Sequence, residues 1–101
     1  MVNELMKELG LDETPDNEAL ISSLVADAQL ITLDSISSTA TQDDYKNNNL
    51  FNRAVKTLAT QLFYDRTLSE GTSLGYQMIV THLQMGVLSS ADTNATSNEN
   101  I

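Results

Sequence analysis

The chain contains no cysteine, one proline and four glycines among its 101 residues. Without cysteine it can form neither a disulfide nor a thiolate metal site, and it is compatible with a reducing cytoplasm. Because proline and glycine interrupt helices, their scarcity favours long uninterrupted helices. The length fits one small domain, and the hydrophobic share of 41% is ordinary for a globular protein.

Basic residues are also few, since five Lys and Arg face fourteen Asp and Glu and give a net charge of −9. Binding nucleic acid through its phosphates needs clustered bases, so we expect no specific nucleic-acid binding. The charge is uneven: residues 1–44 carry −9, residues 45–66 carry +3 and the remainder carries −3. The acidic part is either a solvated face or one half of a charge-complementary contact between neighbouring copies.

Long apolar runs are missing too. No segment approaches the ~20 apolar residues that a membrane span needs, so we expect no membrane contact. Residues 1–9 have neither a basic region nor a long apolar core, so we expect no signal peptide.

Apolar residues at helical spacing predict an all-α fold. A short helix is expected over residues 2–9, with Gly10 as its stop. A long helix is expected from 15 to about 36, because Thr14 can cap it and Pro15 suits its first position.

The second half of the chain predicts two more helices. A polar loop over 37–48 precedes an amphipathic helix that starts near an asparagine at 47–49 and ends at Tyr64-Asp65-Arg66. Ser73 can cap a final helix that runs to about Met85, with Gly86 as its stop.

Together these elements predict a small helical bundle built on a long antiparallel helix hairpin, with a short N-terminal and a short C-terminal helix. The expected division is a helical domain over residues 1–88 and a flexible polar tail over 89–101. The last helix carries apolar residues on more than one face, which suggests that its second side is covered by another subunit.

The residues that could support chemistry are scattered. His82 is the only histidine and falls on an apolar stripe, which is typical of a core or interface histidine. The acids of residues 12–18 lack the order of a calcium loop and are better explained by a helix start. Asp43-Asp44 is a lone pair in a polar loop and is typical of solvated carboxylates. We therefore expect no catalytic, cofactor-binding or metal-binding residue, and no enzyme activity.

The order of these segments resembles the small head–tail connector proteins, also called head-completion or adaptor proteins, of long-tailed phages. The segments that carry the resemblance are Leu9-Gly10-Leu11-Asp12-Glu13, the helix from Asn17 to Ala28, the helix from Arg53 to Ala59 with Phe63-Tyr64-Asp65-Arg66, and Ser73-Leu74-Gly75-Tyr76-Gln77-Met78-Ile79 with Leu83. The resemblance spans roughly residues 3–85. It lies in the order and residue composition of the segments rather than in a catalytic motif.

The resemblance implies a virion protein made in the cytoplasm of the bacterial host and placed at the head–tail interface. It implies a ring of about twelve copies below the portal protein, closed by a head-to-tail contact. The ring would extend the DNA channel and offer a surface to a tail-side stopper or tail-completion protein.

Two sets of residues follow from that expectation. Candidate contacts with another subunit or the portal are Tyr64, Arg66, Tyr76, Val80 and Met85. Candidate channel-facing acids are Asp12, Glu13, Asp43 and Asp44. Acids suit a channel lining because like charges repel the phosphates of passing DNA. The alternative function is a small helical partner-binding or regulatory module, active as a monomer or dimer.

Overall fold

The computed structural model describes the backbone of residues 1–69 and 71–96 and the side chains of residues 1–69 and 71–86. Over these residues it contains four α-helices, one short 3₁₀-helix and no strand. They are α1 (Val2–Glu8), α2 (Pro15–Ile36), η1 (Gln42–Tyr45), α3 (Asn49–Tyr64) and α4 (Leu74–Thr96). The predicted all-α fold is confirmed.

The end of α1 follows from Gly10. This glycine has a φ of +71°, a backbone conformation that favours glycine. It allows the Gly10 N–H to donate to the Lys7 carbonyl at 3.1 Å and the Leu11 N–H to donate to the Met6 carbonyl at 2.9 Å. These two bonds form a Schellman motif, which satisfies the last carbonyls of α1.

The start of α2 is the one that the sequence predicts. The Thr14 hydroxyl accepts a hydrogen bond from the Asn17 N–H at 3.2 Å, and Pro15 occupies the first position of the helix. Asp16 and Glu18 lie in the first turn, where negative charge is favoured by the helix dipole.

The connection between α2 and α3 is more ordered than the polar sequence suggests. Its middle forms η1, and the Thr41 N–H donates to Asp44 Oδ2 at 2.9 Å in a capping box. The Asn48 side chain then caps α3 by accepting from the Phe51 N–H at 2.9 Å, as predicted. An asparagine cap was predicted from the sequence, whereas η1 was not.

The last helix begins as predicted, because the Ser73 hydroxyl accepts from the Tyr76 N–H at 3.2 Å. Its predicted length is wrong. The helix continues through Gly86 to Thr96 and, at 23 residues, is the longest of the described helices. A glycine stops a helix when it takes a positive φ, as Gly10 does, and Gly86 does not. The predicted tail therefore starts as helix, and residues 97–101 lie outside the described residues.

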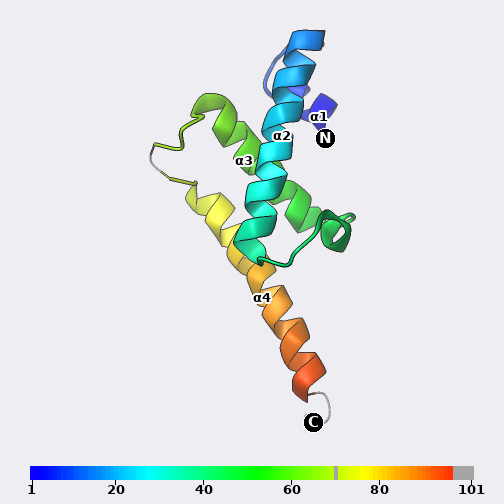
Figure 1. The fold of residues 1–101 in the computed structure, drawn as a ribbon. Coiled ribbons are helices and arrows are strands. Elements are labelled where there is room, and N and C mark those ends of the chain that lie inside the picture. Colours follow the sequence, from blue (N-terminus) through cyan, green and yellow to red (C-terminus); the bar gives the residue numbers. More distant parts are fainter. Residues whose placement is uncertain (70, 97–101) are drawn as a thin grey trace.

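The four helices share one core. In Figure 1, α3 crosses α2 obliquely, and α4 packs against both of them before its C-terminal part projects beyond the other helices. Ala28, Ala54 and Ala59 are fully buried, and their small side chains let the helices approach closely. The finer prediction, a long antiparallel hairpin, stays a prediction. The buried core residues are Leu5, Met6, Ile21, Leu24, Val25, Ala28, Leu33, Ile36, Phe51, Ala54, Val55, Leu58, Ala59, Leu62, Tyr76, Val80 and Leu83.

The prediction that no segment is long and apolar enough to span a membrane needs a correction at α2. By length and composition alone it is apolar enough to cross a membrane, and it is the only such helix among the described residues. The same test is passed by core helices of soluble proteins. Part of the apolar surface of α2 lies in the core, with Ile21 and Ala28 fully buried. The expectation that the chain makes no contact with a membrane stays a prediction.

Candidate functional site: interaction surfaces

The outer face of α4 carries exposed apolar side chains that the core does not use. Leu74, Met78 and Met85 expose 71%, 65% and 60% of their side chains. The opposite side of the same helix is buried through Tyr76, Val80 and Leu83. A surface helix normally presents polar residues to solvent, so exposed apolar residues in a row indicate a binding surface.

Two of the five predicted contact residues, Tyr76 and Val80, are buried in the described part of the chain. Tyr76 and Val80 are buried against the chain's own helices, so their side chains are not available to another subunit in this conformation. Their side chains point to the core because the spacing of residues around the helix places them on the side opposite Met78 and Met85. Tyr64, Arg66 and Met85 are exposed and stay candidates.

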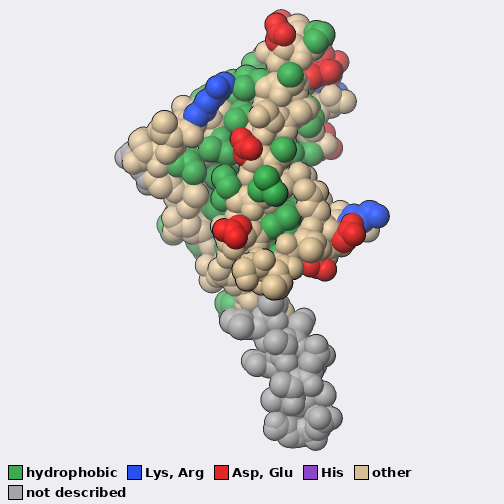
Figure 2. Space-filling model, viewed as in Figure 1, with side chains coloured by type: hydrophobic (Ala, Val, Ile, Leu, Met, Phe, Trp, Pro, Cys, Tyr) green, Lys and Arg blue, Asp and Glu red, His purple; other side chains and the backbone are tan. Residues whose placement is uncertain are grey.

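The four predicted channel-facing acids are all exposed but do not form one cluster. Asp12 and Glu13 precede the start of α2, whereas Asp43 and Asp44 lie beyond its end, in η1. A helix of 22 residues separates the two pairs by roughly 33 Å at 1.5 Å per residue. Figure 2 shows acidic side chains spread over one face of the molecule, with hydrophobic side chains between them.

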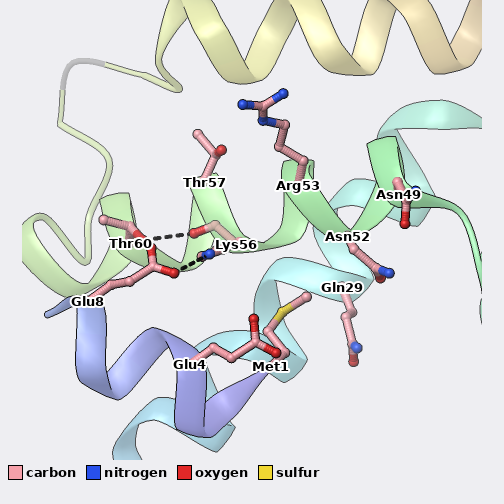
Figure 3. A pocket seen from close by; sticks show the side chains of 10 residues that line it. All are labelled: Met1, Glu4, Glu8, Gln29, Asn49, Asn52, Arg53, Lys56, Thr57 and Thr60. Carbon is pink, nitrogen blue, oxygen red and sulfur yellow. Dashed lines mark hydrogen bonds and ion pairs between the residues drawn. The ribbon is translucent and has the colours of Figure 1, made fainter.

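A polar groove with a volume of about 840 Å³ lies where α1, α2 and α3 meet. Its lining combines two acids and two bases with amides and hydroxyls (Figure 3). The lining residues are Met1, Glu4, Glu8, Gln29, Asn49, Asn52, Arg53, Lys56, Thr57 and Thr60. Lys56 and Glu8 form an ion pair that ties α1 to α3.

The charged groups of the polar groove do not converge on one point. Figure 3 shows Arg53 directed away from Glu4 and Glu8, which lie on the opposite side of α3. A catalytic acid–base pair needs both groups within hydrogen-bond reach of one reacting atom. The arrangement is therefore suited to polar contacts with a partner surface rather than to proton transfer.

A second groove, of about 600 Å³, lies beside α4 and contains the only histidine. His82 is exposed at its edge, so the core role considered for it is wrong, while an interface role stays a prediction. Tyr45 stacks on Phe51 with ring centroids 5.2 Å apart. The pKa of Tyr45 is raised, first by its partial burial and second by the negative charge of Asp44. The groove is lined by Ser37, Thr39, Ala40, Asp44, Tyr45, Asn48, Leu50, His82, Leu83 and Gly86.

Within the described part of the chain, no three His, Cys, Asp or Glu side chains are grouped so that they could hold a metal ion. Comparison with known proteins adds no assignment: no family model, no curated protein and no solved structure matches the chain. The resemblance to connector proteins therefore stays a prediction, and the surfaces above carry the functional inference.

The two grooves were not predicted from the sequence. Each is built by residues from three or four separate segments, and none of these segments has an unusual pattern of its own. The signal that could have indicated the polar groove is the polar side of α3, where Asn49, Asn52, Arg53, Lys56 and Thr60 recur at helical spacing. The exposed face of α4 was the one surface that apolar spacing did indicate.

Proposed function

We propose that this chain is a structural head–tail connector of a long-tailed phage, which forms a ring below the portal and offers an attachment surface to the tail. In this proposal it is made in the host cytoplasm, and DNA passes through the ring without specific binding. The observation that carries the proposal is α4, which over residues 74–86 has a buried side and an exposed apolar side. Such a helix suits a protein whose work is assembly.

The order of elements also supports the proposal. A short helix ends at Gly10, α2 begins at the Thr14 cap, and α4 begins at the Ser73 cap. These are the boundaries on which the resemblance to connector proteins depends. The proposal includes the antiparallel pairing of α2 and α3 as the rigid frame of each subunit.

The charge distribution supports a channel lining. Asp12, Glu13, Asp43 and Asp44 are exposed, as are Asp27 and Asp34 on α2. Carboxylates facing the channel would keep DNA from adhering to the ring, because like charges repel. If α2 faces the channel, both acidic pairs flank the same passage, one at each end.

The deciding experiment is the mass of the full chain alone and after mixing with a portal protein, by light scattering with negative-stain imaging. Rings of the chain, free or only on the portal, are the expected result. A chain that keeps the same mass and binds no portal would contradict the proposal. Tyr64→Ala and Arg66→Ala test two of the three remaining exposed contact residues, with Leu30→Ala on α2 as the matched control, since Leu30 is also exposed.

One observation favours a second candidate, a small helical partner-binding module. The groove beside α4 contains Tyr45, Leu50 and Leu83, which are the kinds of side chain that receive a partner helix. Such a module would be a monomer or dimer and would be indifferent to the portal. The same mass measurement therefore separates the two candidates.

A further inference from the structure

The exposed face of α4 contains glycine as well as large apolar residues. At about 100° per residue, six positions fall within about 120° of the helix surface. They are Leu74, Gly75, Met78, His82, Met85 and Gly86. All six are exposed, and the buried side chains of Tyr76, Val80 and Leu83 lie on the other side of the helix.

The two glycines are not required by the chain's own fold. A Cβ added at Gly75 or Gly86 would meet no atom within 4 Å, and neither glycine has a positive φ. A glycine inside a helix lowers helix stability relative to alanine. Gly86 therefore costs the isolated chain stability without relieving any contact within it. A glycine on a helix surface is useful where another backbone or a large side chain approaches closely.

The face is also uncharged. Residues 74–86 contain no Asp, Glu, Lys or Arg, whereas the chain as a whole carries a net charge of −9. Two copies that met through α2 or η1 would bring exposed acids together. Two copies that met through this face of α4 would bring together two surfaces without charged side chains. Charge therefore favours a second copy of α4 as the occupant of the face.

We infer that two copies of the chain associate through antiparallel α4 helices, with a two-fold axis between Val80 and Thr81. Gly75 and Gly86 are equally distant from that point in the sequence, so Gly75 of one copy lies opposite the partner's Gly86. Met85 then lies one residue from the level of the partner's Gly75, and Leu74 lies one residue from the level of the partner's Gly86. The two-fold axis keeps Gly75 and Gly86 of both copies at one edge of the contact, where the backbones can approach closely, and Leu74 and Met85 of both copies at the other edge, where they pack against each other.

The inference goes beyond the proposed function and does not depend on it. A two-fold contact is isologous and closes with two copies, whereas a ring needs a head-to-tail contact. The dimer is therefore a property of the free chain. It covers the apolar face that the isolated subunit leaves exposed to water.

The association is tested on the full chain without a portal, by sedimentation velocity over a concentration series. We expect a dimer that dissociates on dilution. Met78→Glu places two like charges near the axis and is expected to raise the dissociation constant at least tenfold. Leu30→Glu is the matched control, because Leu30 is 63% exposed and Met78 65% exposed, and Leu30 lies on α2. A monomer at all concentrations, or equal effects of the two variants, would overturn the inference.

The register is tested with single cysteines, which the absence of native cysteine makes unambiguous. In the antiparallel pair the two copies of residue 82 are offset by roughly 4.5 Å along the axis, and those of residue 85 by roughly 13.5 Å. A disulfide needs Cα atoms within about 7 Å. His82→Cys should therefore cross-link on oxidation and Met85→Cys should not. Cross-linking of both variants to the same extent would contradict the antiparallel register.

A last measurement tests whether Gly75 and Gly86 allow the two helices to approach closely. Gly75→Ala with Gly86→Ala should weaken the dimer at least tenfold while raising the helicity of the dilute monomer, measured by circular dichroism. Opposite effects on folding and association separate a contact role from a structural one. An unchanged dimer would show that no close approach occurs at these positions. Because no portal is present, failure here leaves the connector proposal standing, and failure of portal binding leaves the dimer standing.

Discussion

The hydroxyl groups of Thr32 and Tyr76 share a buried hydrogen bond of 2.9 Å, which joins the C-terminal part of α2 to the start of α4. Thr32 is the only polar residue among the buried side chains of the described chain, and Tyr76 is its partner across 44 positions of sequence. A buried hydroxyl without a partner is costly, so the pair fixes where α4 begins on α2.

The first prediction concerns this pair. Tyr76→Phe leaves the Thr32 hydroxyl without its partner and should lower the free energy of unfolding by about 1–2 kcal/mol. Thr32→Val in the same background should restore part of the loss, because both polar groups are then removed. Urea unfolding of the two single variants and the double variant gives the coupling energy, which we expect to be about 1 kcal/mol. Additive losses would show that the bond contributes nothing.

The start of α4 illustrates what the sequence predicts well. The caps at Thr14, at an asparagine in 47–49 and at Ser73 were predicted, because a cap depends on a residue and its neighbours three positions later. The end of α4 shows the opposite case. Gly86 looks like a helix stop in sequence, but a glycine ends a helix only when its φ becomes positive, and the surroundings decide that.

The surfaces of the molecule were also predicted only in part from the sequence. The two-sided apolar pattern of α4 was visible in the sequence, but which side enters the core was not. Tyr76 and Val80 were expected at an interface and are buried, because the rotation of α4 is set by its contacts with α2 and α3. The polar groove was not predicted, since Glu8 and Lys56 come together only through the packing of α1 on α3.

The second prediction concerns that ion pair. Glu8 and Lys56 are 54% and 32% exposed, so water and salt screen their attraction. Glu8→Gln should lower the free energy of unfolding by less than about 1 kcal/mol, and the difference should shrink in 1 M salt. Glu4→Gln is the matched control, because Glu4 lines the same groove and no ion pair is found for it in the described residues. A loss that is independent of salt would contradict a screened surface pair.

The third prediction concerns Asp65, which follows α3. The pKa of Asp65 is lowered, first by the hydrogen bond from the Thr67 hydroxyl and also by bonds from the Ser69 hydroxyl and N–H. A carboxyl whose pKa is lower in the folded state stabilises the fold above its unfolded pKa. That contribution is lost as the pH falls below about the ordinary value of 3.8 and through the lower folded pKa.

The measurement is thermal unfolding between pH 7 and pH 2 for the native chain and for Asp65→Asn. The variant should be less stable at pH 7 and should show a shallower loss of stability below pH 4, because the group that takes up a proton on unfolding has been removed. Asp43→Asn, an exposed acid of η1, is the control for removing one negative charge. Parallel curves for the native chain and Asp65→Asn would contradict a stabilising contribution from the lowered pKa of Asp65.

The fourth prediction uses one substitution at two glycines. Gly86→Ala should raise the free energy of unfolding of the dilute monomer by about 1 kcal/mol, because Gly86 lies inside α4 in helical conformation and a Cβ meets open space. Gly10→Ala should lower it by a similar amount, about 1 kcal/mol, because the φ of +71° is strained for alanine although its surroundings are equally open. The two variants add the same methyl group, so the sign of the effect isolates the backbone conformation. Urea unfolding at a concentration below dimer formation measures both, and effects of the same sign would show that α4 does not continue through Gly86.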